Sequence, residues 1–188
     1  MKKLFSVKLN TTAITTMALF VALEIVLEFL FKMIPGQPQG GTISIALVPI
    51  LLASYLMGAG YGLLVGLAST LLQFVLGLAV YYGPWSVILD YLIPVTIIGL
   101  ASIFPTVKIR SFSLYTGIIV VMILKFVSHY LSGAWLFAEY APAGQSPWAY
   151  SFGYNIVYCL PTLVLCYIVF ALLDSPLKKA IHFKNRNI

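Results

Sequence analysis

Charged residues are scarce in this 188-residue chain: they make up 9% of it, whereas hydrophobic residues make up 61%. Soluble domains carry about 25% charged residues, so this chain has too little polar surface to coat a water-soluble globule. A transmembrane helix needs about 20 mostly apolar residues, and the length therefore accommodates about six spans joined by short loops. Nothing is left over for a separate soluble catalytic domain.

Cysteine and histidine are also scarce. Cys159 and Cys166 lie in one apolar segment, too far apart to bond to each other, and are interpreted as small packing residues. His129 is the one histidine inside a predicted span, so no metal site and no cofactor are expected. The sequence lacks the phosphate-binding loop of P-loop ATPases and the common hydrolase motifs. We therefore expect that the chain neither hydrolyses ATP in that way nor acts as an enzyme.

Hydrophobic runs separated by turn residues divide the chain into six predicted spans within a single membrane domain, residues 1–188. Proline and glycine mark the breaks, as in Pro35–Gly41 and Gly58–Gly60. The expected fold class is an all-α integral membrane protein, a bundle of six transmembrane helices. The spans are expected at about 11–34, 43–57, 61–80, 85–104, 112–137 and 148–173.

Basic residues outnumber acidic ones by 11 to 5. They gather before the first predicted span, between the fourth and fifth, and after the sixth, which with six spans is one side of the membrane. The positive-inside rule assigns that side to the cytoplasm, so both termini are expected there and no nucleic-acid site is inferred. These residues are Lys2, Lys3, Lys8, Lys108, Arg110, Lys178, Lys179, Lys184 and Arg186.

Two pairs of small residues permit close approach between helices. Gly62 and Gly66 form a Gly-xxx-Gly pair, and Ala18 and Ala22 form a second small-xxx-small pair. Such pairs are common in apolar helices, so each is a weak signal by itself.

Several ionisable residues lie inside the predicted spans, where they are costly and often functional. Counted from the span ends, Asp90, His129 and Asn155 fall at one depth, in the outer half of the membrane. Lys125 and His129 share a helix face by their spacing. A pocket open to the outside explains this convergence better than a network that only ties helices together.

Aromatic residues accompany this polar set and suit a flat ring or an organic cation. Asp90 would supply the negative charge. Glu24, Glu28 and Lys32 are instead interpreted as pairing along one helix face at i, i+4 spacing. The aromatic residues are Tyr81, Tyr82, Tyr91, Trp135, Phe137, Tyr150 and Tyr154.

Four stretches of the chain resemble the substrate-binding S components of energy-coupling factor (ECF) transporters, specifically those that bind thiamine. They are Pro38–Ile45 leading into Val48–Ile50, then Leu89–Tyr91, Lys125–Gly133 and Ala149–Asn155. The resemblance implies a multi-pass protein of the bacterial plasma membrane, surrounded by lipid. It also implies a thiamine site near the outer face, partly enclosed by the loop after the first span.

The resemblance further implies roles for single residues. Asp90 stands where the family has a ligand-binding acid, and Trp135 or Phe137 stands where an aromatic ring stacks on the ligand. Some members carry Trp and Glu before the second span, where this chain has Gly40 and Ser44. Together with the polar and aromatic set above, the expected thiamine-binding residues are Tyr82, Asp90, Tyr91, Lys125, His129, Trp135, Phe137, Tyr150 and Asn155. Ala18 and Ala22 match the motif that docks S components on the transmembrane coupling subunit.

The expected function is capture of thiamine from outside for import driven by two separate ATPase subunits. One alternative is an S component for another flat vitamin or precursor, such as hydroxymethyl-pyrimidine or riboflavin. Another is an autonomous secondary transporter that uses Lys125 and Asp90 as a proton relay. An intramembrane enzyme with His129 as base is disfavoured because the sequence has no paired nucleophile motif.

Overall fold

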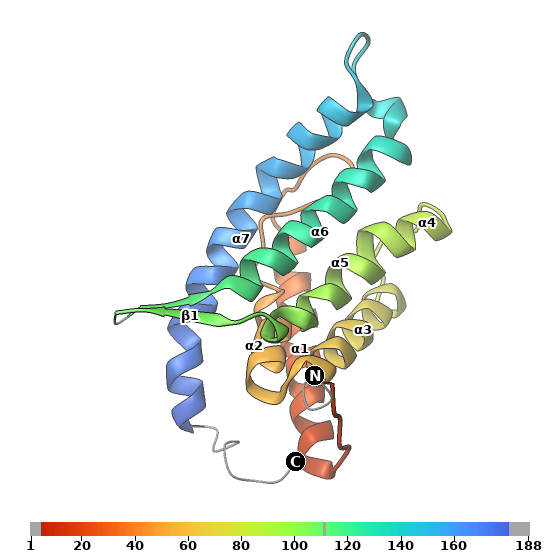
Figure 1. Cartoon of the computed structure of the whole chain (residues 1–188). Coiled ribbons are helices and arrows are strands. Elements are labelled where there is room, and N and C mark those ends of the chain that lie inside the picture. Colours follow the sequence, from red (N-terminus) through yellow and green to blue (C-terminus); the bar gives the residue numbers. More distant parts are fainter. Residues whose placement is uncertain (1–4, 111, 181–188) are drawn as a thin grey trace.

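The computed structural model describes residues 5–110 and 112–180, apart from the side chains of Phe112, Lys179 and Ala180. Within these residues the chain forms a helical bundle with one short β-hairpin (Figure 1). The elements are α1 Thr11–Lys32, α2 Val48–Met57, α3 Ala59–Val75, α4 Pro84–Ser86, the π-helical η1 Val87–Leu92, α5 Ile93–Thr96, the 3₁₀-helical η2 Ile97–Ile103, β1 Thr106–Ile109, β2 Phe112–Tyr115, α6 Thr116–Trp135, the 3₁₀-helical η3 Ala138–Tyr140 and α7 Pro147–Ala180. Lys2, Lys3, Lys184 and Arg186, used for the predicted orientation, lie outside the described residues.

The expected all-α membrane fold class is confirmed, because each predicted span is represented by a helical segment of the described residues. Four of these segments are long and apolar enough to cross a membrane, whereas α2 and α3 are shorter. The start of α1, the hairpin and the end of α7 lie toward the end of the bundle opposite the loop between α6 and α7 (Figure 1). The four long segments are Thr11–Lys32, Pro84–Ile103, Thr116–Trp135 and Pro147–Lys178.

The α2 helix is much shorter than a bilayer is thick. Its 10 residues rise about 15 Å, whereas the hydrocarbon core measures about 30 Å. Residues 33–47 precede it without helix or strand, and Ser44 within them is buried. The helix thus begins at Val48 rather than at residue 43 as expected, because Pro49 suits a first helical turn and Gly40 and Gly41 take positive φ angles.

The fourth span is an irregular helix. Its α4 turn continues into the π-helical η1 segment, followed by α5 and η2. Pro94 has no backbone N–H to offer the carbonyl of Asp90, which the regular α-helical pattern would require. Single π-helical turns are frequently found at functional sites, and this one carries Asp90 and Tyr91.

The Gly-xxx-Gly pair of α3 packs directly against the fourth span. A Cβ atom added to Gly62 would lie 2.9 Å from the Cα of Gly99, and one added to Gly66 would lie 2.9 Å from the Cα of Thr96. A Cβ atom added to Gly99 would overlap the carbonyl group of Gly62. The predicted close approach at this pair is therefore confirmed.

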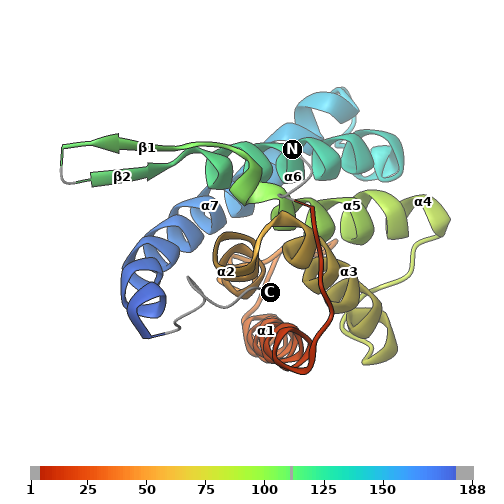
Figure 2. The ribbon, with the colours of Figure 1, turned by 60° about the horizontal axis from the view of Figure 1, so that its bottom comes forward.

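The connection between the fourth and fifth spans is an antiparallel hairpin that projects sideways from the bundle (Figure 2). Its β1 strand is built largely from the β-branched residues that favour strands. The α6 helix consequently begins at Thr116, not at residue 112 as expected.

Candidate functional site

A cavity of about 450 Å³ lies between α1, α3, η1, α6, α7 and the irregular segment 33–47. All the residues expected to bind the ligand line it except Trp135. These lining residues are Tyr82, Asp90, Tyr91, Lys125, His129, Phe137, Tyr150 and Asn155.

Trp135 and Phe137, the two candidates for a stacking ring, lie in different places. Trp135 is 61% exposed, and its ring packs on Trp85 with 5.5 Å between centroids, outside the cavity. Phe137 follows the end of α6, lines the cavity and contacts the ring of Tyr82 edge-on at 5.4 Å. The structure therefore brings Phe137, and not Trp135, to the expected site.

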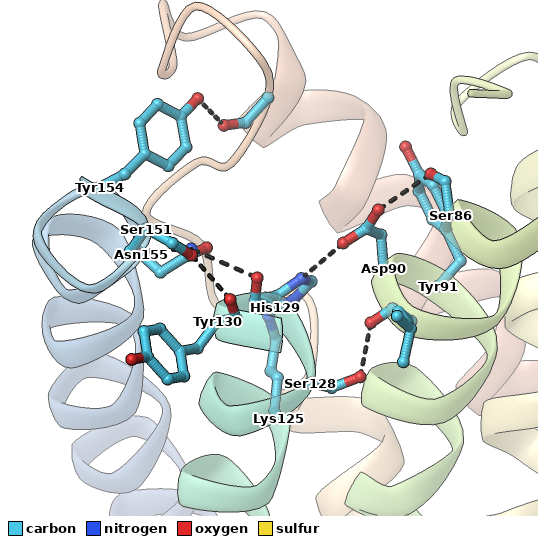
Figure 3. A network of polar contacts seen from close by, with 12 residues as sticks. Ser86, Asp90, Tyr91, Lys125, Ser128, His129, Tyr130, Ser151, Tyr154 and Asn155 are labelled. Atoms are coloured by element: carbon cyan, nitrogen blue, oxygen red, sulfur yellow. Dashed lines mark hydrogen bonds and ion pairs between the residues drawn. The ribbon is translucent and has the colours of Figure 1, made fainter. Parts of the chain in front are cut away.

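Asp90, His129 and Lys125 form a chain of polar contacts along one wall of the cavity (Figure 3). His129 Nδ1 lies 3.5 Å from Asp90 Oδ1, and Lys125 Nζ lies 2.6 Å from His129 Nε2. Because an ammonium group can only donate, Nε2 is the acceptor, and Nδ1 carries the proton that is shared with Asp90. The imidazole is neutral in this arrangement, and Ser86 Oγ donates to the other oxygen of Asp90 at 2.9 Å.

Asn155 presents a fixed amide from α7. Its Nδ2 donates to the carbonyl oxygen of Ser151 at 2.9 Å, and its Oδ1 accepts a hydrogen bond from the Tyr158 hydroxyl. Ser151 Oγ donates to the carbonyl oxygen of Tyr130 on α6 at 2.8 Å. A Cβ atom added to Gly133 would overlap Ser151, so a glycine is needed where α6 and α7 touch. This contact sets the distance between His129 on α6 and Asn155 on α7, which line the cavity from two sides.

The segment 33–47 is fastened over the cavity by tyrosines of α7. The hydroxyl of Tyr154 accepts a hydrogen bond from Gln39 N at 2.9 Å and donates one to the Gly40 carbonyl at 2.7 Å. Gly41 lies so close to Tyr158 that a Cβ atom would overlap the tyrosine ring. The irregular segment is thus a wall of the cavity with defined contacts.

Two polar residues missing from the expected ligand set lie at the α1–α3 side. Glu24 is completely buried, lines the cavity, and accepts a hydrogen bond from Gln73 Nε2 at 2.7 Å. The expected pairing along α1 is confirmed for Glu28 and Lys32, at 3.7 Å. It does not extend to Glu24, because Gln73 of α3 reaches that carboxylate. Gln73 is uncharged, so a search for ionisable residues in the spans passes over it.

Comparison with known proteins identifies the family. A family model described as "Thiamine transporter protein (Thia_YuaJ)" matches residues 14–182. "Thiamine transporter ThiT" of Bacillus subtilis (strain 168) is 32% identical over 166 residues, which cover 83% of this chain and 86% of that protein. The chain belongs to the thiamine transporter protein family. It is accordingly a multi-pass bacterial membrane protein and a transport component rather than an enzyme, as expected.

Solved structures share the fold of this thiamine transporter family member. One, described as "Native-SAD phasing for ThiT from Listeria monocytogenes serovar.", matches with a TM-score of 0.73 at 20% identity, over 89% of this chain and 96% of that one. Another is described as "Structure and mechanism of the S component of a bacterial ECF transporter". It matches with a TM-score of 0.60 at 24% identity, over 89% of this chain and 98% of that one.

The charge and chemistry of the cavity suit a transported ligand. Glu24, Glu28 and Asp90 bring three carboxylates against the two lysines Lys32 and Lys125. Aromatic rings supply much of the remaining wall, and among the described residues no cluster of potential metal ligands is found. A family member with this cavity can hold a flat, positively charged organic molecule between rings and carboxylates.

Proposed function

We propose that the chain is the thiamine-binding S component of an ECF-type importer, capturing the vitamin from outside the cell. The observation that carries the proposal is the single cavity that joins Asp90, His129 and Asn155 to a wall of aromatic rings. Membership of the thiamine transporter family supports it, as does the similarity of the fold to the S component of a bacterial ECF transporter.

Thiamine is a flat aminopyrimidine joined to a cationic thiazolium. Asp90 accepts a hydrogen bond from the exocyclic amine, and the amide of Asn155 pairs with the pyrimidine edge. Phe137 offers a ring face beside Tyr82, and the neutral imidazole of His129 adds no repulsive charge. We assign the ligand-binding role to Tyr82, Asp90, Tyr91, Lys125, His129, Phe137, Tyr150 and Asn155.

The α1 wall supports a place for the thiazolium. Gly40 and Ser44 bring no charge or ring to the segment over the cavity. Glu24 and Glu28 line the same cavity from α1 and supply negative charge there. We therefore place the cationic ring toward α1 and the aminopyrimidine toward Asp90.

Isothermal calorimetry with the purified protein tests the proposed ligand. Thiamine should bind at one site per chain and more tightly than hydroxymethyl-pyrimidine or riboflavin in the same competition panel. Tighter binding of another vitamin would move the chain to the alternative S-component function, and failure to bind thiamine would contradict the proposal.

The proposed partners are a transmembrane coupling subunit and two ATPases. Ala18 and Ala22 are exposed on α1, where they are free to meet such a subunit. Uptake into liposomes should require ATP and all the partner subunits, and Ala22→Trp should abolish uptake while thiamine affinity is retained. Uptake by the chain alone, driven by a proton gradient, would support a secondary transporter instead.

The fastening of segment 33–47 should slow release of the vitamin. Tyr154→Phe removes the hydroxyl that bonds Gln39 and Gly40. Each lost hydrogen bond is worth about 1 kcal/mol, so the dissociation rate measured by stopped-flow fluorescence should rise roughly five- to thirtyfold. Tyr81→Phe is the matched control. Tyr81 is 66% exposed, so removing its hydroxyl should leave the dissociation rate unchanged. An unaltered rate in Tyr154→Phe would mean that the segment does not hold the ligand in.

A further inference from the structure

The β1–β2 hairpin has one apolar face and one polar face. Its register pairs Val107 with Leu114 and Lys108 with Ser113. Side chains alternate across a strand, and directly opposed residues share a face. Val107, Ile109 and Leu114 therefore lie on one face, and Lys108 and Ser113 on the other. Val107 and Ile109 are 43% and 55% exposed, so the chain itself leaves the apolar face largely uncovered.

Tyr115 shows which way each face points. It is paired with Thr106 in the register, which puts it on the same face as Lys108. Its hydroxyl donates to Asp174 Oδ2 at 2.8 Å, and its backbone N–H donates to the Tyr167 hydroxyl at 3.1 Å. Asp174 lies closer than Tyr167 to the C-terminal end of α7, which is the end away from the cavity. The polar face of the hairpin therefore points toward the C-terminal end of α7. The apolar face points the other way, toward the end of the bundle that holds the cavity.

The α7 helix carries exposed apolar side chains at the level of the hairpin. The hairpin joins the ends of two spanning segments and extends outward from them, with the last turns of α7 continuing past it (Figure 1). On α7, Leu165, Ile168 and Leu172 are 39%, 50% and 70% exposed, as expected for side chains that face acyl chains. The hairpin leaves the bundle at the level of these turns of α7, because Tyr115 at its end contacts Tyr167 and Asp174.

The basic side chains complete the pattern. Lys108 and Arg110 are exposed, and the ion pairs of lysine in the described part of the chain involve Lys32 and Lys178 instead. Basic residues beside an apolar face are attracted to the anionic phosphates of the cytoplasmic leaflet. A connection immersed in water would gain nothing from this alternation of apolar and basic residues.

We propose that the β1–β2 hairpin lies in the membrane–water interface as a lipid anchor. Val107, Ile109 and Leu114 enter the edge of the acyl layer, and Lys108 and Arg110 bind the phosphates of anionic phospholipids. This role is separate from vitamin capture and stands whichever ligand the cavity takes.

Spin labels on the full chain in nanodiscs of phosphatidylcholine and phosphatidylglycerol test the anchor. The natural cysteines Cys159 and Cys166 are buried and are replaced by alanine. Single labels are then attached at V107C, K108C, I109C and S113C. Labels at 107 and 109 should relax with oxygen, and labels at 108 and 113 with a water-soluble nickel chelate. Preferential nickel access at all four positions, or the reverse alternation, would overturn the proposal.

A charge-removal series tests the headgroup contact. In discs containing phosphatidylglycerol, Lys108→Gln with Arg110→Gln should lower the oxygen accessibility of the label at position 109 at least twofold. Lys8→Gln, an exposed basic residue before α1, should not. Thiamine affinity should be the same in all variants, which separates this result from a failure of the proposed function. Protection of the label at 109 only when the coupling subunit is added would make the hairpin a protein-docking element and refute the lipid anchor.

Discussion

Asp90→Asn is expected to weaken thiamine binding by tenfold to a hundredfold in isothermal calorimetry. The substitution keeps the shape of the side chain, but it removes the negative charge that accepts the hydrogen bond of the exocyclic amine. It also leaves one oxygen where Asp90 has two, so either Ser86 Oγ or His129 Nδ1 loses its acceptor. Hydrogen bonds to charged groups are worth about 1.5–3 kcal/mol, and each 1.4 kcal/mol is about a tenfold change in affinity. The Asp90 side chain is only 19% exposed, so water screens its charge less than that of a surface carboxylate.

Glu139→Gln provides the matched control for Asp90→Asn. It makes the same chemical change at an exposed carboxylate in η3, and Glu139 is outside the cavity lining. Affinity should therefore stay within about twofold of the wild type, because exposed charges are screened by salt over about 10 Å. Equal affinities for wild type, Asp90→Asn and Glu139→Gln would remove Asp90 from the site while leaving thiamine binding itself intact.

Gly99→Ala is expected to destabilise the bundle strongly. The added Cβ atom would overlap the backbone carbonyl of Gly62, which cannot rotate away as a side chain could. Overpacking of this kind costs about 1–3 kcal/mol, and more when backbone must move. For a chain of this size we expect the melting temperature in detergent to fall by roughly 5–10 °C.

Gly153→Ala on α7 separates steric overlap from the general effect of replacing a helical glycine. A Cβ atom there would meet no neighbour within 4 Å. Alanine also favours helix over glycine by about 1 kcal/mol, so this variant should melt at or slightly above the wild-type temperature. If both variants melted alike, the contact between α3 and the fourth span would not be as tight as the structure shows.

The bundle and the location of its cavity were predictable because they depend on properties that a sequence displays directly. Runs of apolar residues give the spans, and the spacing of Asp90, His129 and Asn155 within them gives a common depth. The structure brings these three residues to one cavity. Counting residues from the span ends was sufficient to place them, although the fourth span, which carries Asp90, is an irregular helix.

Other parts of the site depend on contacts between distant segments. Trp135 and Phe137 are two residues apart, yet only the second lines the cavity, because the direction of the chain after α6 decides it. Gln73 lies near Glu24 only through the packing of α3 on α1. The hairpin was missed because the aromatic and apolar residues of Phe112–Tyr115 suit both a strand and the start of a spanning helix.

The brevity of α2 has a consequence for how the cavity can vary. A full-length helix at this position would fill the outer part of the bundle, so the binding site occupies the room that half of a spanning helix would otherwise take. Residues 34–47 contribute much of the wall as plain coil. Coil can exchange residues such as Gly40 and Ser44 without altering helix packing. Substitutions in this one short segment can therefore change which ligand the cavity accepts, while the helices that carry Asp90, His129 and Asn155 stay in place.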